Sequence, residues 1–232
     1  MLELPTVTLF CADCYEVNRA VKIMERCTAV ANFGAVKLMT SLPTTYPHKV
    51  EIPPISSHNA YSIWMLKRAH LYVDTPHFLV VQHDGFILNA DSWNPAWLQY
   101  DYMGPLFTQE YSPPLVGTGG FSLRSKKLQE YVNSRMPAWD GSDADAQRLQ
   151  AQIGAYEDGV IAIRLRNELI GQGYKFAPVS EAVKFAQGGY PNRESKNPTD
   201  QTYYCEKPFG FHNYWANINF DTGHVSPPPF HV

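Results

Sequence analysis

The stretch that most constrains the fold of this chain is 78–88, where an apolar run meets a polar cluster. Four apolar residues are followed by Gln82, His83 and Asp84, and apolar residues resume after Gly85. Such a run is typical of a strand buried on both faces in the centre of an α/β sheet. An acid just beyond that strand lies at the carboxyl edge of the sheet, where α/β proteins bind ligands. The segment by itself equally allows an Asp-Gly turn between two hairpin strands.

The preceding residues alternate between strand and helix patterns, and this favours the first interpretation. A β-rich segment at 6–11 precedes helical spacing of apolar residues over 16–30, and a second strand pattern follows at 35–39. After a loop region at 40–54 that is rich in Pro and Thr, Ser57 is a plausible cap for a helix over about 58–72. The order β-α-β-α-β predicts a parallel sheet of the nucleotide-binding type over the first ninety residues.

The second half of the chain mixes glycine-rich, helical and irregular segments. Three glycines within 117–120 precede a β-like Phe-Ser-Leu segment. Helices are predicted over 126–135 and 155–170, with a polar acidic loop at 140–145 between them. The last fifty residues show little periodicity and end in a proline-rich extended tail. We therefore expect one mixed domain without repeats.

Composition excludes several classes of protein. Hydrophobic residues make up 44% of the 232 residues and charged residues 18%, which is typical of a globular domain with a sizeable core. The net charge of −3 argues against a general nucleic-acid-binding protein, which would be basic. Two small basic clusters keep a local patch open, although solvated helix faces explain them at least as well. These are Arg124 with Lys126 and Lys127, and Arg164 with Arg166.

The cysteines and the hydropathy pattern bear on location. Cys11 and Cys14 have C-x-x-C spacing, so a thiol oxidoreductase is one alternative, but no second such pair completes a structural zinc site. We expect all four cysteines to be free, non-catalytic thiols in a reducing cytosol. Because no N-terminal signal pattern and no apolar run of about 20 residues occurs, we expect a cytoplasmic protein without a transmembrane segment.

Three polar islands carry side chains suited to chemistry: Gln82-His83-Asp84, Glu157-Asp158 and His212-Asn213. A hard divalent cation prefers oxygen ligands, often with an imidazole, and Asp84 and His212 supply one of each. Gly119 and Gly120 allow close backbone approach to a sugar or phosphate. A carboxylate of the Glu157-Asp158 pair, at a helix start, suits removal of a proton from a hydroxyl.

Each of these residues also has a purely structural explanation. Asp84 can make a turn, and Asp158 can stabilise the positive end of a helix dipole. His212 lies among aromatic residues and can be a core histidine whose hydrogen bonds are satisfied. Asp101, between two tyrosines, can hold a loop. Only the combination of these islands therefore points to a function.

The islands, in this order, resemble the GT-A fold glycosyltransferases, and more narrowly poorly characterised bacterial and phage proteins predicted to belong among them. The resemblance covers roughly residues 5–215, and its most specific piece is the Gly-Gly-Phe-Ser-Leu-Arg segment. The matching segments are Val81–Gly85, Tyr100–Gly104, Gly117–Arg124, Glu157-Asp158 and Phe209–His212.

The resemblance implies an α/β, GT-A-like single domain over residues 1–232. A Rossmann-type nucleotide-binding half would span about 5–90. A mixed sugar- and acceptor-binding half would span about 91–215, followed by the extended tail at 216–232.

The resemblance also implies a role for each matching residue. GT-A enzymes carry a D-x-D motif after a central strand, which holds a divalent metal on the nucleotide-sugar diphosphate. The matching triplet here has Gln82 in place of the first acid. Asp84 and His212 would bind Mn²⁺ or Mg²⁺, and Asp158 would act as general base beside Glu157. The implied nucleotide- and donor-binding residues are Phe10, Cys11, Ala12, Asp13, Gln82, His83, Asp84, Gly119, Gly120 and Phe121.

The activity implied is transfer of a hexosyl or pentosyl group from a nucleotide-diphosphate sugar to an acceptor hydroxyl. The GT-A-like fold implies that the donor is a UDP-sugar. Inversion is expected because one base and no evident nucleophile are present. The acceptor would be a surface or lipid-linked glycan, or a modified DNA base, which the negative net charge disfavours mildly. Gln82 supports an alternative, a nucleotide- or sugar-binding module without catalysis. The sequence leaves the oligomeric state open.

Overall fold

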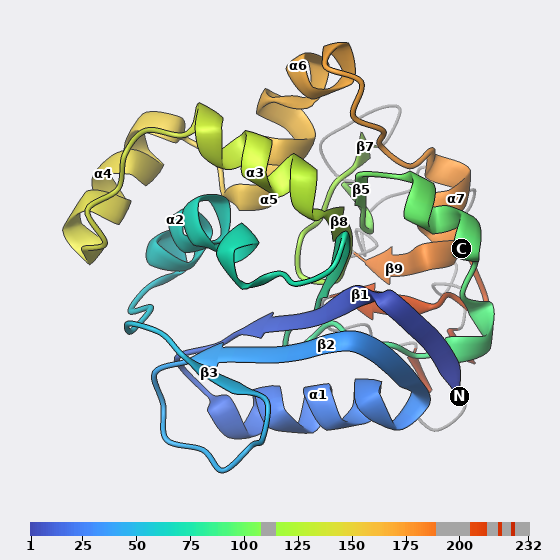
Figure 1. Ribbon diagram of the computed structural model, residues 1–232. Coiled ribbons are helices and arrows are strands. Elements are labelled where there is room, and N and C mark those ends of the chain that lie inside the picture. The colour runs from blue at the N-terminus through green and yellow to red at the C-terminus, as the bar shows by residue number, and fades with distance from the viewer. Residues whose placement is uncertain (108–114, 189–204, 213–217, 220–223, 226–232) are drawn as a thin grey trace, which may run out of the picture.

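The computed structural model describes residues 1–107, 115–188, 205–212, 218–219 and 224–225. Its centre is a six-stranded mixed sheet with the strand order β3-β2-β1-β4-β8-β5 (Figure 1). Strands β3, β2, β1 and β4 are parallel, whereas β8 is antiparallel to both of its neighbours. The sheet strands are β1 (Leu2–Ala12), β2 (Ala31–Thr40), β3 (Lys49–Glu51), β4 (His77–Val80), β5 (Tyr102–Met103) and β8 (Ser122–Ser125).

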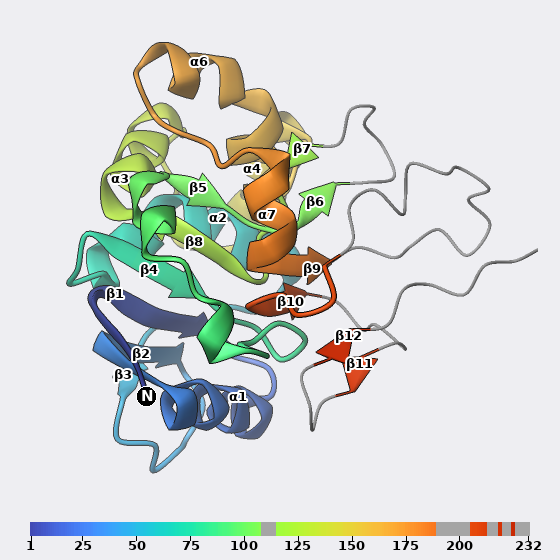
Figure 2. The ribbon, with the colours of Figure 1, turned by 90° about the vertical axis from the view of Figure 1, so that its right-hand side faces the viewer.

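This topology confirms the predicted α/β fold. The chain runs from β1 outward to β2 and β3, and then returns to the other side of β1 as β4. The carboxyl ends of β1 and β4 therefore meet where the strand order reverses, which is the ligand-binding crevice of open α/β sheets. Figure 2 shows the short strands β9 (Ala186–Gly188) and β10 (Gly210–His212) on the side toward which β4 points.

Helices cover both faces of the sheet. Helix α1 (Val17–Val30) lies below it in Figure 1, and α2 (His58–Arg68) and α3 (Lys126–Arg135) lie above it. The remaining helices and short strands complete the second half. They are α4 (Asp143–Ile153), α5 (Glu157–Gly159), α6 (Arg166–Gly171), α7 (Val179–Phe185), β6 (Leu106–Phe107), β7 (Leu115–Val116), β11 (Ile218–Asn219) and β12 (His224–Val225).

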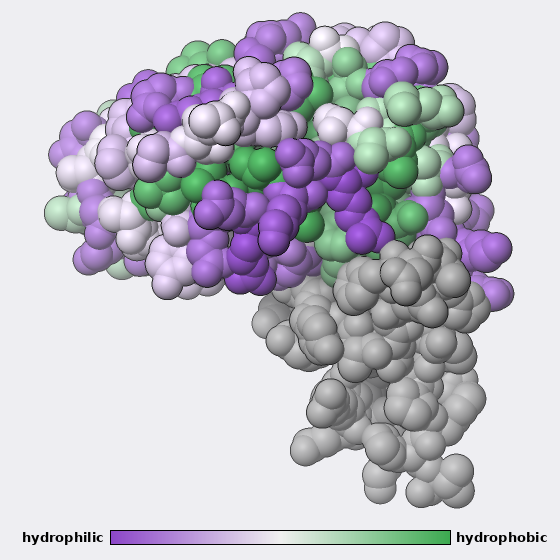
Figure 3. Space-filling view, turned by 90° about the horizontal axis from the view of Figure 1, so that it is seen from below, coloured by the Kyte–Doolittle hydropathy of each residue, from purple (hydrophilic) through white to green (hydrophobic). Residues whose placement is uncertain are grey.

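Alternation along the central strand β1 divides the core between the two faces of the sheet. Leu9 is buried in the cluster that includes Met24 of α1, whereas the adjacent Phe10 is buried in the cluster that includes Trp64 of α2. Successive side chains of a strand point to opposite faces, so a central strand must be apolar on both. Figure 3 shows the underside of the molecule, where hydrophilic residues lie between more hydrophobic areas.

Local sequence signals place most element boundaries. The hydroxyl of Ser57 accepts a hydrogen bond from the Ala60 N–H at 3.1 Å, as predicted for the cap of α2. The predicted helix over 58–72 is an α-helix to Arg68 and then a 3₁₀ turn over Ala69–Tyr72. The helix expected over 126–135 is confirmed as α3.

Three segments differ from the prediction. The loop region expected at 40–54 contains the short strand β3, which pairs in parallel with β2. The acidic loop expected at 140–145 contains the start of α4, because Ser142 caps it and Asp143 lies in its first turn. The single helix expected over 155–170 is divided into α5, a π-helical turn at Val160–Arg164 and α6. Within the described residues, no helix is long and apolar enough to cross a membrane.

Candidate functional site

The segment after β4 forms a tight turn that carries Asp84. The N–H of Gln82 donates to the carbonyl of Gly85 at 3.0 Å, and the N–H of Gly85 donates back to the Gln82 carbonyl at the same distance. The turn does not join adjacent strands of the main sheet, because β4 pairs with β1 and β8. Both interpretations of this stretch thus hold in part: a buried parallel strand ends in a turn, and the turn lies at the carboxyl edge.

Strand β10 brings His212 to this turn. The N–H groups of Leu88 and Asn89 both donate to the carbonyl of Phe209, at 2.8 and 3.1 Å, which fixes the start of β10 beside the chain that leaves the turn. His212 Nε2 consequently lies 3.8 Å from Asp84 Oδ1. Burial lowers the pKa of His212 despite the opposing charge of Asp84, so its imidazole is neutral at neutral pH.

One buried oxygen at this point, Asp84 Oδ1, has no hydrogen-bond partner among the described residues. Buried polar atoms are normally hydrogen-bonded, so an unpaired one beside a second ligand-type side chain suits binding of water, an ion or a ligand. The separation of 3.8 Å between Asp84 and His212 is too long for a hydrogen bond, but it lets both side chains contact one divalent ion.

Two consecutive glycines separate this pair from the acidic pair of α5. A Cβ on Gly119 would lie 2.3 Å from Glu157 Oε1, and a Cβ on Gly120 would lie 1.9 Å from His212 Nε2. Since real Cβ atoms do not approach other atoms so closely, a side chain at either position would force the neighbouring carboxylate or imidazole to move. The backbone N–H of Gly119 donates to Asp158 Oδ2 at 3.1 Å. One dipeptide therefore contacts the carboxylates on one side and the imidazole on the other.

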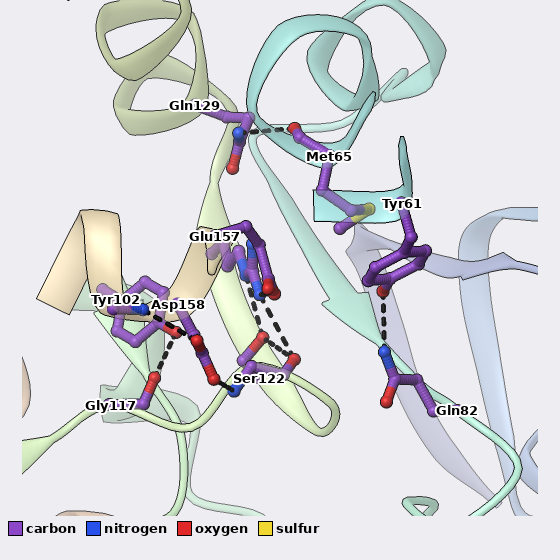
Figure 4. Close-up of polar contacts among 12 residues, drawn as sticks. Tyr61, Met65, Gln82, Tyr102, Gly117, Ser122, Gln129, Glu157 and Asp158 are labelled. Atoms are coloured by element: carbon purple, nitrogen blue, oxygen red, sulfur yellow. Dashed lines mark hydrogen bonds and ion pairs between the residues drawn. The ribbon is translucent and has the colours of Figure 1, made fainter. Parts of the chain in front are cut away.

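A buried ion pair between Arg124 and Glu157 contacts the glycine segment. The guanidinium of Arg124, on β8, is fully buried and donates to Glu157 Oε1 at 2.9 Å and to the carbonyl of Gly119 at 3.2 Å. Its Nε donates to the Ser122 hydroxyl at 2.9 Å, and that hydroxyl donates to the same carbonyl at 2.7 Å (Figure 4). Glu157 is only 5% exposed, so its carboxylate interacts with Arg124 and hardly with solvent.

Asp158 differs from Glu157 in its electrostatics. Burial, and secondly the neighbouring charge of Glu157, raise the pKa of Asp158 to about 7. Hydrogen bonds from the Gly159 and Gly119 N–H groups, and the charge of Arg124, oppose this rise. A carboxyl whose pKa lies near neutrality can both accept and return a proton at physiological pH, which suits a general base.

The chain matches one family of proteins. The match is to the family described as a protein of unknown function, DUF5672, over residues 47–212. The chain belongs to the DUF5672 family. No match was found among curated proteins.

Among solved structures, this DUF5672 protein is similar to the crystal structure of a glycosyltransferase involved in the glycosylation of the major capsid of PBCV-1. The TM-score is 0.54, and the match covers 94% of this chain and 97% of that chain at 10% sequence identity. At this identity the likeness establishes the fold, which is glycosyltransferase-like.

Some residues that the resemblance assigns to donor binding lie in the core of this DUF5672 protein. The side chains of Phe10, Cys11 and Phe121 are at most 1% exposed. Phe10 packs against aromatic rings of β4 and α2, and Phe121 packs against rings of α7 and the start of β10. These three side chains pack in the core beside the crevice, and their assignment to donor binding stays a prediction.

The other predicted donor-binding residues lie at the carboxyl edge. Ala12 ends β1 with 8% exposure, and Asp13 follows it, where its Oδ1 accepts from the N–H groups of Tyr15 and Glu16 at the start of α1. His83 is exposed in the turn after β4. These positions remain candidates for contact with a donor.

The cysteines of the described chain are free thiols. Burial, followed by the charge of Asp13, strongly raises the pKa of Cys11, which keeps this thiol protonated and unreactive. Cys14 is half-buried. A C-x-x-C redox centre needs a stabilised thiolate, and the geometry at Cys11 opposes one.

Several residues of the site carry no clear signal in the sequence. Arg124, which the sequence places in a solvated basic cluster, is buried beneath the site, and the acid that pairs with it lies 33 residues further along the chain. Tyr61 of α2 contacts Gln82, and Tyr102 of β5 donates to the carbonyl of Gly117 at 2.5 Å.

Asp101 accepts hydrogen bonds from the Ser125 hydroxyl and the Lys175 N–H, which fits its structural explanation. Only the resemblance placed Arg124 in a specific segment.

Proposed function

We propose that the protein is a glycosyltransferase that moves a sugar from a nucleotide-diphosphate sugar to an acceptor hydroxyl. The observation that carries this proposal is the convergence at Gly119-Gly120. Asp158 contacts the first glycine, and His212 contacts the second, with Asp84 3.8 Å from the imidazole. A glycine segment between a pair of side chains that can bind a cation and a carboxylate that can act as a base suits transfer from a diphosphate to a hydroxyl.

The cation-binding part of the proposal rests on Asp84 and His212. The chemistry of this pair, one carboxylate oxygen and one neutral imidazole, fits Mn²⁺ or Mg²⁺. The described residues contain no group of three or more His, Cys, Asp or Glu that could hold a metal by themselves, so diphosphate oxygens and water would supply further ligands. When bound, such an ion neutralises charge on the leaving diphosphate.

Proton transfer and positioning are assigned to residues of the chain. Asp158 accepts the proton of the acceptor hydroxyl as the acceptor oxygen bonds to the anomeric carbon and the bond from that carbon to the diphosphate breaks. The N–H groups of Gly119 and Gly159 hold the carboxylate in place. Glu157 and Arg124 position α5 against the glycine segment. Because one base faces the reaction and no nucleophile is identified, we propose inversion at the anomeric carbon.

The donor is proposed to be a UDP-sugar, bound at the switch point between β1 and β4. Asp13 follows the first of these strands and Gln82-His83-Asp84 follows the second. The acceptor is proposed to be a glycan hydroxyl. The similar PBCV-1 enzyme acts in the glycosylation of a capsid, which favours a glycan or glycoprotein over a DNA base as acceptor. The protein is proposed to act in the cytoplasm.

The test combines binding with turnover. Nucleotide sugars are screened by thermal shift with Mn²⁺, because a ligand that binds only the folded state raises the melting temperature. The binding donor is then incubated with glycan acceptors, and release of nucleoside diphosphate is measured for the wild type, Asp158→Asn and Asp140→Asn. Asp140 is an exposed acid outside the site and serves as the matched control.

We expect Asp158→Asn to lose at least about 100-fold in transfer, since general-base catalysis contributes about that much. Asp140→Asn should behave as the wild type. Failure of all common nucleotide sugars to shift the melting temperature would count against the proposal. Donor binding without transfer to any acceptor would instead favour the second candidate, a nucleotide-sugar-binding module, for which Gln82 in place of an acid is the supporting observation.

A further inference from the structure

The candidate site contains a neutral amide where the resemblance implies a carboxylate, and the structure holds that amide in one orientation. Gln82 Nε2 donates to the hydroxyl of Tyr61 on α2 at 2.7 Å (Figure 4). The backbone N–H and carbonyl of Gln82 are both paired with Gly85, so the backbone of the residue is fixed as well. An amide has one oxygen and one NH₂ group, so holding the nitrogen on Tyr61 turns Oε1 away from it.

The oxygen of Gln82 lies beside the same glycine as the imidazole of His212. A Cβ built on Gly120 would lie 1.9 Å from His212 Nε2 and 2.5 Å from Gln82 Oε1, so both atoms lie against the same glycine. The same Nε2 lies 3.8 Å from Asp84 Oδ1. Gln82 Oε1 and His212 Nε2 therefore lie beside one glycine, and Asp84 Oδ1 lies 3.8 Å from that nitrogen. Amide oxygens are accepted by hard divalent cations alongside carboxylates and imidazole.

We propose that Gln82 Oε1 is a third, neutral ligand to a divalent cation held by Asp84 and His212, and that Tyr61 is the positioning residue that turns this oxygen toward the ion. The inference deepens the proposed function and rests on its cation-binding part. It explains why the site tolerates an amide: a fixed amide supplies the same oxygen as a carboxylate without its charge.

Tyr61 is suited to this role. Its hydroxyl accepts a hydrogen bond from the amide nitrogen at 2.7 Å, so it holds the nitrogen rather than the oxygen of Gln82. The neutral amide also has a consequence for binding. With one carboxylate instead of two, the site attracts a free cation less strongly, so the cation binds more tightly together with the negatively charged diphosphate of a donor.

The experiment titrates Mn²⁺ alone into the full chain by calorimetry. Wild type, Tyr61→Phe, Gln82→Glu and the double variant are compared. We expect Tyr61→Phe to weaken Mn²⁺ binding about 3- to 10-fold, the worth of one hydrogen bond that orients a ligand. Gln82→Glu should bind Mn²⁺ more tightly than the wild type, because it restores a charge. In that background Tyr61→Phe should have no effect, since a carboxylate presents an oxygen whichever way it is flipped.

Tyr46→Phe is the matched control, because the Tyr46 hydroxyl is also buried and has no hydrogen-bond partner among the described residues. It should leave Mn²⁺ binding unchanged. An equal loss from Tyr61→Phe in the wild-type and Gln82→Glu backgrounds would show that the hydroxyl acts on the fold alone and would overturn the inference. Unchanged Mn²⁺ affinity in Tyr61→Phe, or the absence of Mn²⁺ binding from every variant, would overturn it too.

The inference and the proposed function fail separately. The expected pattern of Mn²⁺ affinities without turnover of any donor would leave the three-ligand cation site standing and reject the glycosyltransferase. Sugar transfer that is equally fast with Mn²⁺ and with a chelator would keep the enzyme and reject the cation site.

Discussion

Replacing Asp158 with Asn should make the protein more stable at alkaline pH and change how its stability depends on pH. Burial is the main cause that raises the pKa of this carboxyl from 3.8 to about 7, so the folded state holds the proton more tightly than the unfolded state. The stabilising contribution of the protonated form is fully present below about pH 4, the unfolded pKa. This contribution is lost progressively as the pH rises to the folded pKa of about 7, and above that pH the stability no longer changes with the ionisation of Asp158.

The magnitude follows from the shift. About 3 pKa units at about 1.4 kcal/mol per unit amount to about 4 kcal/mol between the two limits. This is a large share of the 5 to 15 kcal/mol, roughly, that stabilises a typical domain. Asn carries no ionisable group, so the variant lacks this dependence. The hydrogen bonds from Gly119 and Gly159 that Asn keeps or loses give an offset that does not vary with pH.

The assay is urea unfolding of the wild type and Asp158→Asn from about pH 4 to about pH 8, with the free energy of unfolding extrapolated to water. The difference between variant and wild type should rise by about 4 kcal/mol over this range, at about 1.4 kcal/mol per pH unit in its middle. Asp140→Asn is the control: hydrogen bonds from Ser142 lower the pKa of Asp140, so it is ionised in both states above about pH 5 and its difference should be flat. Parallel curves for wild type and Asp158→Asn would refute the raised pKa, and with it the electrostatic basis for a general base.

Two further predictions concern the supports of the site. Glu157→Gln leaves the buried guanidinium of Arg124 without its counter-charge and should lower the free energy of unfolding by about 3 to 5 kcal/mol, measured with denaturant. Adding Arg124→Met should restore most of this free energy. A loss below about 1 kcal/mol in Glu157→Gln would contradict a buried ion pair. Gly120→Ala puts a Cβ 1.9 Å from His212 Nε2, so the imidazole must move and Mn²⁺ affinity should fall at least about 10-fold. Gly171→Ala, where a Cβ meets nothing within 4 Å, should leave that affinity unchanged, and equal behaviour of the two alanine variants would exclude the close packing at position 120.

Much of the secondary structure follows from local patterns in the sequence. The β-rich segment of β1, the helical spacing of α1 and the Ser57 cap of α2 are properties of neighbouring residues, so the sequence predicts them. The start of α4 is also signalled locally by Ser142, although its acidic composition suggests a loop. The π-helical turn after α5 carries no such signal.

The parallel half-sheet and the identity of the polar islands follow from the sequence alone, because hydrophobic periodicity and turn residues act over a few positions. Which polar side chains are buried depends instead on contacts between distant segments. The tertiary structure alone therefore shows that the polar side chain of Arg124 is buried beneath the site. It also shows that the side chains of Phe10 and Phe121 lie in the core. The same holds for the meeting of His212 with Asp84, since β10 returns to the turn after β4 through backbone contacts that no local pattern encodes.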